Sequence, residues 1–162
     1  MGETTVKFSC THCGFCCDKV ICLPTPYDVI RIVKETGADP YKFLVFITKD
    51  DISGVTKNDP TWLEAGGERF LMALKRTAKG CYFLHRTKRT CTAYEHRPML
   101  CRLFPFKLEE NKYGVFKGFS LHKNVGCPKE RGFDVPTDPL HEIYLEDRKH
   151  HEAYNDLVEI FN

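Results

Sequence analysis

The stretch that decides this structure is CTHCGFCC, residues 10–17, which holds four cysteines in eight positions. A Cys-x-x-Cys step lets two sulfur atoms point inward across one tight turn, as zinc or one face of a cubane iron–sulfur cluster requires. Two consecutive steps place the sulfurs of Cys10, Cys13 and Cys16 around one centre, and Gly14 lets the loop wrap tightly. The run therefore predicts a metal site carried on a loop.

Cys17 needs a separate explanation, because neighbouring side chains diverge in most backbone conformations. Cys17 therefore either serves a second centre or supports the first one. The chain has nine cysteines, and eight of them supply two four-sulfur centres. The predicted ligands are Cys10, Cys13, Cys16, Cys17, Cys81, Cys91, Cys101 and Cys127. Cys22 is left as the spare.

The run favours iron–sulfur chemistry, with zinc as the alternative. Bacterial ferredoxins use the triple spacing with a further cysteine followed by proline, and Cys127 is followed by Pro128. The competing interpretation is a zinc knot that only holds the fold, since zinc folding energies of about 10 kcal/mol can replace a missing core. Any one distant cysteine, taken alone, would be read as a buried apolar thiol. His12, inside the run, is more often a hydrogen-bonding or solvent-facing side chain than a ligand.

Length and composition predict one domain over residues 1–162. The N-terminus has no apolar segment typical of a signal peptide, and no apolar run approaches the roughly 20 residues of a membrane span. We therefore expect a cytoplasmic protein without a membrane span. In a reducing compartment a cysteine cluster indicates metal or redox chemistry, and an odd number of cysteines argues against full disulfide pairing.

The charge is unevenly placed along the chain. Residues 79–131 hold twelve Lys and Arg against four Asp and Glu, an excess of +8, so the rest of the chain carries −6 of the net +2. Nearby cations lower the pKa of thiols and offset the charge of about −2 on a four-thiolate centre. A basic face can also dock an acidic redox-partner protein. The aromatic residues lie among cysteines and expected strands, so we do not expect nucleic-acid binding. No pattern specifies an oligomeric state.

The predicted fold class is α+β, a small irregular metal-stapled domain with helices near both ends and short antiparallel β-hairpins. Thr25-Pro26 starts a helix that Gly37 ends. The further elements we expect are a short helix from Asp39-Pro40 to about Phe46, a loop over 49–67, a strand over 70–74, strand pairs 81–84 with 91–94 and 104–108 with 115–121, and a final helix from Asp138-Pro139. Metal sites would tie the N-terminal loop to residues 81–127.

Three further segments carry a family resemblance: GCYFL at 80–84, CTAYEHRPMLCRLFP at 91–105, and GC at 126–127. With the run at 10–17, they make the chain resemble the CxxCxxCC cysteine-cluster family, the YkgJ-type proteins. The same eight cysteines match, and Cys22 does not. The resemblance implies zinc or iron chelation, or an iron–sulfur oxidoreductase.

Related cluster domains occur within larger enzymes that methylate lysine. This chain has no glycine-rich cofactor loop and little room for a second catalytic domain, so that activity is not expected here. It also lacks a nucleophile elbow, an H-E-x-x-H motif and a P-loop. We expect an electron-transfer or accessory protein more than a stand-alone enzyme.

Two arginines are candidate residues beside the cofactor. Pro98 fixes the backbone ahead of Cys101, and Arg97 and Arg102 can donate hydrogen bonds to thiolates or to Glu95 and nearby carbonyls. Donors to the sulfurs tune the potential of a cluster. The alternative is an ordinary surface salt bridge, which we favour for Arg102.

The leading hypothesis is an iron–sulfur protein with one or two 4Fe-4S centres, acting in electron transfer or as an accessory subunit of a redox enzyme. The second is a colourless zinc-stapled binding module that chelators unfold. The third is a metallochaperone or metal sensor with an accessible spare thiol. A thiol oxidoreductase that uses Cys16-Cys17 or a Cys-x-x-Cys pair would not explain the four further cysteines.

Overall fold

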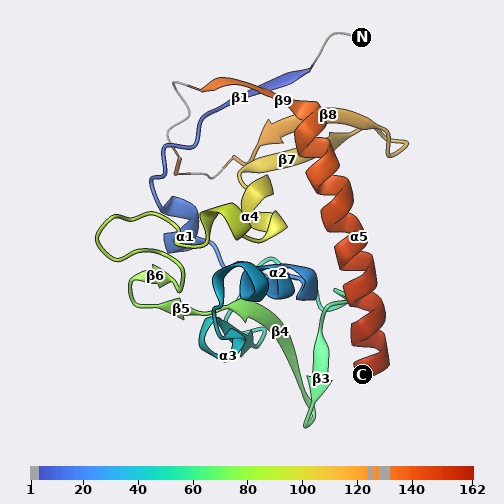
Figure 1. The fold of residues 1–162 in the computed structure, drawn as a ribbon. Coiled ribbons are helices and arrows are strands. Elements are labelled where there is room, and N and C mark those ends of the chain that lie inside the picture. Colours follow the sequence, from blue (N-terminus) through green and yellow to red (C-terminus); the bar gives the residue numbers. More distant parts are fainter. Residues whose placement is uncertain (1–3, 124–125, 128–131) are drawn as a thin grey trace.

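A computed structural model describes residues 4–123, 126–127 and 132–162 of the chain (Figure 1). Its elements, in chain order, are β1 (Thr5–Phe8), α1 (Phe15–Lys19), α2 (Pro26–Thr36), α3 (Pro40–Phe43), β2 (Leu44–Ile47), β3 (Leu63–Ala65), β4 (Glu68–Leu74), β5 (Arg76–Thr77), β6 (Gly80–Cys81), a 3-10 turn (Tyr94–His96), α4 (Met99–Leu103), β7 (Phe106–Glu110), β8 (Phe116–Leu121), β9 (Phe133–Pro136) and α5 (Thr137–Phe161). The strand pairs that the structure describes are antiparallel. The α+β prediction is confirmed.

The long helix α5 runs along one side of the molecule and connects its two ends (Figure 1). The pairs β1–β9 and β7–β8 lie at one end, the sheet β2-β4-β3 lies at the other, and α2 and α4 lie between them. At the C-terminal end of α5, Asn162 donates to the Trp62 carbonyl at 2.8 Å and accepts from the Glu64 amide at 2.8 Å. In the described part of the chain, no helix is both long and apolar enough to cross a lipid bilayer.

Helix α2 begins and ends as its sequence predicts. Thr25 and Asp28 form a reciprocal capping box around Pro26, the first residue of the helix. Gly37 ends the helix with a φ of 69°. The Asp28 carboxylate is buried and also accepts from the Met99 amide at 3.1 Å. Because Met99 opens α4, this bond fixes the helix that carries Cys101.

Two expectations for residues 40–67 are wrong in part. The short helix ends at Phe43 rather than near Phe46, and residues 44–47 form β2 against β4. This run of aliphatic and aromatic residues suits a pleated strand. The expected loop also contains β3, which pairs with β4 across Gly66-Gly67 with φ values of 58° and 79°. Positive φ at both positions is what a two-residue hairpin turn requires.

Other boundaries near the cysteines also differ from expectation. The run at 10–17 is not all loop, since Cys16 and Cys17 lie in α1, which follows Gly14 at a φ of 76°. Residues 81–84 and 91–94 do not form two strands; among the described residues they share one bridge, Leu84 with Cys91. Two hydrogen bonds make this bridge, from the His85 amide to the Thr90 carbonyl at 2.8 Å and from the Thr92 amide to the Phe83 carbonyl at 2.7 Å, and the chain then turns into the 3-10 turn at 94–96.

Of the two remaining strand pairs, one was predicted from the sequence and one was not. The second hairpin forms as predicted, with its strands at 106–110 and 116–121. The pairing of β1 with β9 was not expected, because its partners lie at opposite ends of the sequence. It ties the segment before the cysteine run to the start of α5.

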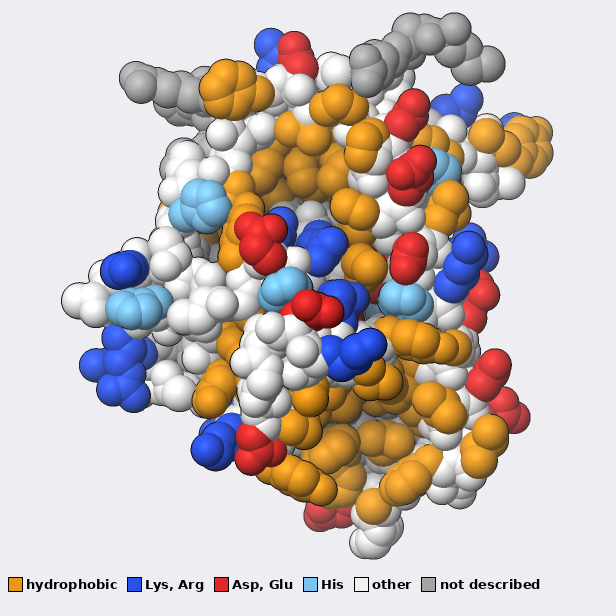
Figure 2. Space-filling model, viewed as in Figure 1, with side chains coloured by type: hydrophobic (Ala, Val, Ile, Leu, Met, Phe, Trp, Pro, Cys, Tyr) orange, Lys and Arg blue, Asp and Glu red, His pale blue; other side chains and the backbone are white. Residues whose placement is uncertain are grey.

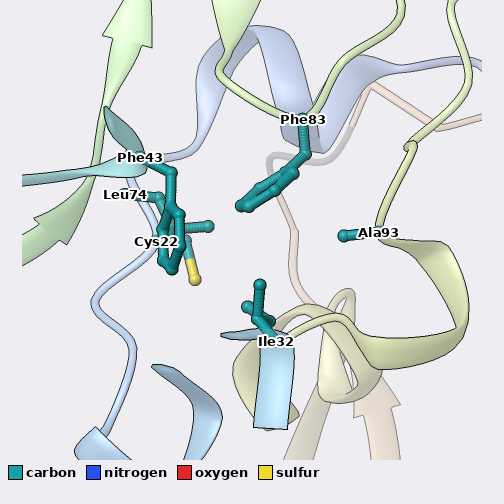
Figure 3. Packing of buried hydrophobic residues seen from close by; sticks show 6 residues of the cluster. All are labelled: Cys22, Ile32, Phe43, Leu74, Phe83 and Ala93. Atoms are coloured by element: carbon teal, nitrogen blue, oxygen red, sulfur yellow. The ribbon is translucent and has the colours of Figure 1, made fainter. Parts of the chain in front are cut away.

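A small apolar core lies beneath the cysteines. Its buried members are Cys22, Ile32, Phe43, Leu74, Phe83 and Ala93 (Figure 3). Cys81, Cys91 and Cys101 are partly buried and pack against this cluster. Three thiols of the candidate site therefore rest directly on the core.

Candidate metal centre

All nine cysteines line one cavity of about 590 Å³. The cavity also touches α1, the loop between β6 and the 3-10 turn, and α4. The eight cysteines predicted as ligands are thus brought together, and Cys22 joins them. Their role as ligands remains a prediction.

One subset, the outer group, contains the two exposed cysteines of the cavity. It consists of Cys10, Cys13, Cys16 and Cys127. Cys10 and Cys13 are exposed to solvent. The pKa of Cys127 is raised to about 11 by burial, with further contributions from Cys13, Cys16 and Cys10. These interactions place the four sulfurs within electrostatic reach of one another.

A second subset, the inner group, has three members that pack against the core and one, Cys17, on helix α1. It consists of Cys17, Cys81, Cys91 and Cys101. Burial raises the pKa of Cys81 to about 11, and the nearby sulfurs of Cys101 and Cys91 add to the shift. Cys81 ends β6 and Cys101 lies in α4, so the core positions both through regular structure.

Cys17 lies between the two groups and interacts with both. Its thiol shares hydrogen bonds with Cys16 and Cys91, and these bonds raise the pKa of Cys17 itself far above its usual range. The same bonds are the main cause of the lowered pKa of Cys16, about 6, and of Cys91, about 7. Cys16 and Cys91 therefore lose their protons more readily than an ordinary cysteine.

Helix α1, which carries Cys16 and Cys17, packs against the strand pair β5–β6, and Arg76 of β5 donates hydrogen bonds to it. Arg76 donates to the Cys17 carbonyl at 3.2 Å, to the Val20 carbonyl at 2.8 Å, and to the Asp18 carbonyl. Gly80 has a φ of 109°, and a Cβ there would lie 2.9 Å from Asp18 Oδ1 and 3.0 Å from the Cys17 carbonyl oxygen. Only glycine lets β6 approach α1 this closely. Sequence analysis did not identify Arg76, because its contacts are 56 to 59 residues away.

The two predicted arginines both line the cavity but act differently. The Arg97 guanidinium lies 3.9 Å from the centre of the Tyr94 ring, and its charge helps lower the pKa of Cys16 and Cys91. Arg102 donates to the carbonyls of Glu95 at 2.8 Å and Arg97 at 3.3 Å. Arg102 therefore holds the turn ahead of α4. Within the described residues, neither forms the surface salt bridge considered as the alternative.

His12, the histidine inside the run, has an aromatic neighbour. Its ring centroid lies 4.9 Å from that of Tyr94.

The charges around the cavity fit thiolate-bound metal. Four arginines line it, Arg76, Arg89, Arg97 and Arg102, and no Asp or Glu does among the described residues. Two four-thiolate centres of about −2 each, whether zinc or an oxidised cubane, would carry about −4. The arginines offset that charge, although Arg89 also pairs with Asp18.

The donor atoms face the cavity without yet enclosing an ion. Across the described ranges, no three Cys, His, Asp or Glu side chains are arranged to hold one. Closing on a metal therefore requires the cysteine side chains to turn. The donor set, nine thiols with arginines and no competing carboxylate, suits soft thiolate-binding metals such as zinc and iron.

A family model described as "CxxCxxCC: Putative zinc- or iron-chelating domain" matches residues 9–128, which is more than half of the chain. The chain belongs to the CxxCxxCC family. The match begins one residue before Cys10 and ends one residue after Cys127, so the CxxCxxCC region contains every cysteine of the cavity. Strand β9 and helix α5 lie outside it. No curated protein and no solved structure matches the chain significantly.

Proposed function

We propose that this protein is an iron–sulfur protein that transfers electrons, alone or as an accessory subunit of a redox enzyme. The outer group would hold a 4Fe-4S cluster, and the inner group would form a second metal centre. The observation that carries the proposal is the gathering of nine cysteines in one cavity, where Cys10 and Cys13 are exposed and Cys81, Cys91 and Cys101 pack on the core.

The outer group supports the cluster assignment by its spacing. Cys10, Cys13 and Cys16 have the ferredoxin-like separation, and Cys127 supplies a fourth sulfur followed in sequence by proline. Pro128 itself lies outside the described residues. Exposure of Cys10 and Cys13 would bring a cluster near the surface, where a partner can approach it.

The surroundings support a redox role. Arg97 places a positive charge near Cys16 and Cys91, and such charges stabilise the reduced form of a cluster, which carries one more electron.

A basic surface beside the cavity would dock an acidic redox partner. Lys79, Arg86 and Lys88 are exposed on and next to the loop that carries Cys81 and Cys91. Figure 2 shows Lys and Arg side chains over this loop and further ones at the middle of the same face. Contacts of this kind speed association and weaken as salt is added.

The visible spectrum of a ligand variant tests this function. Cys13→Ser, purified without oxygen, should lose most of the iron–sulfur absorbance of the wild type, because the outer cluster loses a ligand. His12→Gln is the matched control, since it changes the neighbouring position without removing a sulfur. Full colour and iron in Cys13→Ser would contradict the outer-group assignment.

One observation favours zinc as a second candidate. The sulfurs of Cys22 and Cys101 lie 3.5 Å apart, and two thiolates on one tetrahedral zinc, each about 2.3 Å from it, are about 3.8 Å apart. A protein with zinc in both groups would be colourless and redox-silent. Its role would be that of a metal-stapled binding module, unfolded by chelators.

A further inference from the structure

Cys22 is the one cysteine of the chain that neither the family motif nor the predicted ligand set includes. It lies between α1 and α2 and is 8% exposed. Its carbonyl accepts from the Leu74 amide at 2.9 Å, which anchors this residue to β4. Figure 3 shows its side chain among Phe43, Leu74 and Ile32. The position of its sulfur is therefore set by the core.

That sulfur faces other sulfurs as well as apolar groups. Cys22 Sγ lies 3.5 Å from Cys101 Sγ, and Cys22 lines the cavity with the other eight cysteines. The pKa of Cys22 is raised well above its usual value, chiefly by the hydrogen bond with Cys101 and by burial, and Cys81 also contributes. Cys22 and Cys101 are therefore in contact on the core side, and Cys81 is near enough to interact electrostatically with both.

The short sulfur–sulfur separation distinguishes two kinds of centre. In a cubane cluster each iron takes one cysteine, so no two cysteines share an iron. On a single tetrahedral ion, all ligand sulfurs lie about 3.8 Å apart. The hydrogen-bonded sulfurs of Cys22 and Cys101, 3.5 Å apart, are already close to the separation that such an edge requires.

Cys17 is less suited to be the fourth sulfur of this site. Its thiol is shared between Cys16 and Cys91, one in each group, and it sits on α1 rather than on the core. Cys22 belongs to the same apolar cluster against which Cys81, Cys91 and Cys101 pack.

We propose that Cys22 is a metal ligand, and that it completes a single-ion tetrahedral site with Cys81, Cys91 and Cys101. The site takes a thiophilic divalent ion such as zinc or iron. This inference rests on metal binding by the inner group in the proposed function, and it does not depend on a cluster in the outer group.

Cadmium-113 in the wild-type protein tests the assignment directly. Metal-free, reduced protein would be loaded with ¹¹³Cd²⁺ alone, and proton–cadmium correlation spectra would identify the cysteines whose β-protons couple to each ion. We expect the β-protons of Cys22 and Cys101 to couple to the same cadmium. A cadmium coupled to Cys101 and Cys17 but not to Cys22 would overturn the proposal, and so would the absence of bound cadmium.

Cobalt titration of variants provides an independent measurement. Cys22→Ser keeps the size of the side chain but removes the thiolate, so inner-site Co²⁺ affinity should fall by about 100-fold or more, and the four-thiolate spectrum should be lost. Ile32→Val is the control, because it trims the same buried cluster and leaves every sulfur. An unchanged Co²⁺ spectrum and affinity in folded Cys22→Ser would overturn the proposal.

The two proposals fail separately. Wild type without iron or sulfide, but with Cys22 coupled to cadmium, would remove only the proposed electron-transfer function. Wild type with an iron–sulfur cluster, but without coupling at Cys22, would remove only the single-ion site.

Discussion

The outer and inner groups of cysteines are positioned by different kinds of structure. Cys10 and Cys13 lie on an exposed loop whose geometry comes from their spacing and from Gly14. Cys81, Cys91 and Cys101 rest on a buried apolar cluster. A group that depends on the core should resist disturbance of the loop, whereas the outer group should depend on its metal for order. On the proposed function, one small domain would combine an accessible centre with a structural one.

Metal removal should separate the outer and inner groups most strongly in stability and hydrogen exchange. Chelation under anaerobic, reducing conditions should lower the free energy of unfolding by several kcal/mol, since structural metal sites supply on the order of 10 kcal/mol of folding free energy. Hydrogen exchange should accelerate more around residues 10–17 than in α2. Equal acceleration in both segments would show that the core does not hold its own group in place.

Among single substitutions where β6 meets α1, Gly80→Ala should lower the free energy of unfolding the most. Its Cβ would meet the Asp18 carboxylate and the Cys17 carbonyl at 3.0 Å or less, so we expect a loss of about 3 kcal/mol. Gly114→Ala is the matched control, with a φ of 75° and no atom within 4 Å of its Cβ; it should cost about 1 kcal/mol. Urea unfolding measures both. Equal losses of unfolding free energy in the two variants would mean that α1 can move away from the added Cβ without destabilising the protein.

Arg76→Ala should weaken the attachment of α1. The side chain donates to three carbonyls of residues 17–20, and hydrogen bonds from a charged donor contribute about 1.5–3 kcal/mol. We expect a loss of about 2 kcal/mol together with faster alkylation of Cys16 and Cys17 in the metal-free protein. Lys75→Ala, at the exposed neighbouring position, should change stability by less than about 0.5 kcal/mol. A comparable effect in both variants would remove Arg76 from this role.

The smallest expected effect lies on α5, outside the family match. Burial raises the pKa of Asp147 above its usual value, and its Oδ1 has no hydrogen-bond partner in the described structure. The folded protein therefore binds this proton more tightly than the unfolded chain, so stability should fall as pH rises from the unfolded pKa through the folded one.

Asp147→Asn should abolish that fall and stabilise the protein by about 1 kcal/mol near neutral pH. Asp156→Asn, exposed on the same helix, should leave the pH profile unchanged. Thermal unfolding between pH 4 and 7 distinguishes the two. A wild-type profile in Asp147→Asn would show that another group controls the slope.

Local signals in the sequence predicted part of this structure. Thr25, Pro26 and Gly37 bound α2 because capping acts within a few residues. The cysteine run at 10–17 is also a local signal, because its spacing alone predicted a metal site. The family match supports zinc or iron chelation. Residues 44–47 were misassigned because a short apolar run suits either a helix or a strand until its neighbour β4 is known.

Long-range contacts could not be predicted in this way. Strands β1 and β9 pair across most of the chain, and Arg76 reaches α1 only in the folded state. Cys22 lacked any informative spacing, since the sulfur that it contacts belongs to Cys101, 79 residues away. Its place beside the cavity follows from the core, which no local pattern encodes.

The most direct test of the central claim is the content of iron, zinc and acid-labile sulfide per chain after anaerobic purification, with a visible spectrum of the same sample. The account predicts about four irons and four sulfides with an iron–sulfur chromophore, together with about one further thiolate-bound ion. About eight irons and eight sulfides would keep the electron-transfer proposal and remove the single-ion site. Stoichiometric zinc without sulfide or colour would contradict the central claim and place the protein among zinc-stapled binding modules.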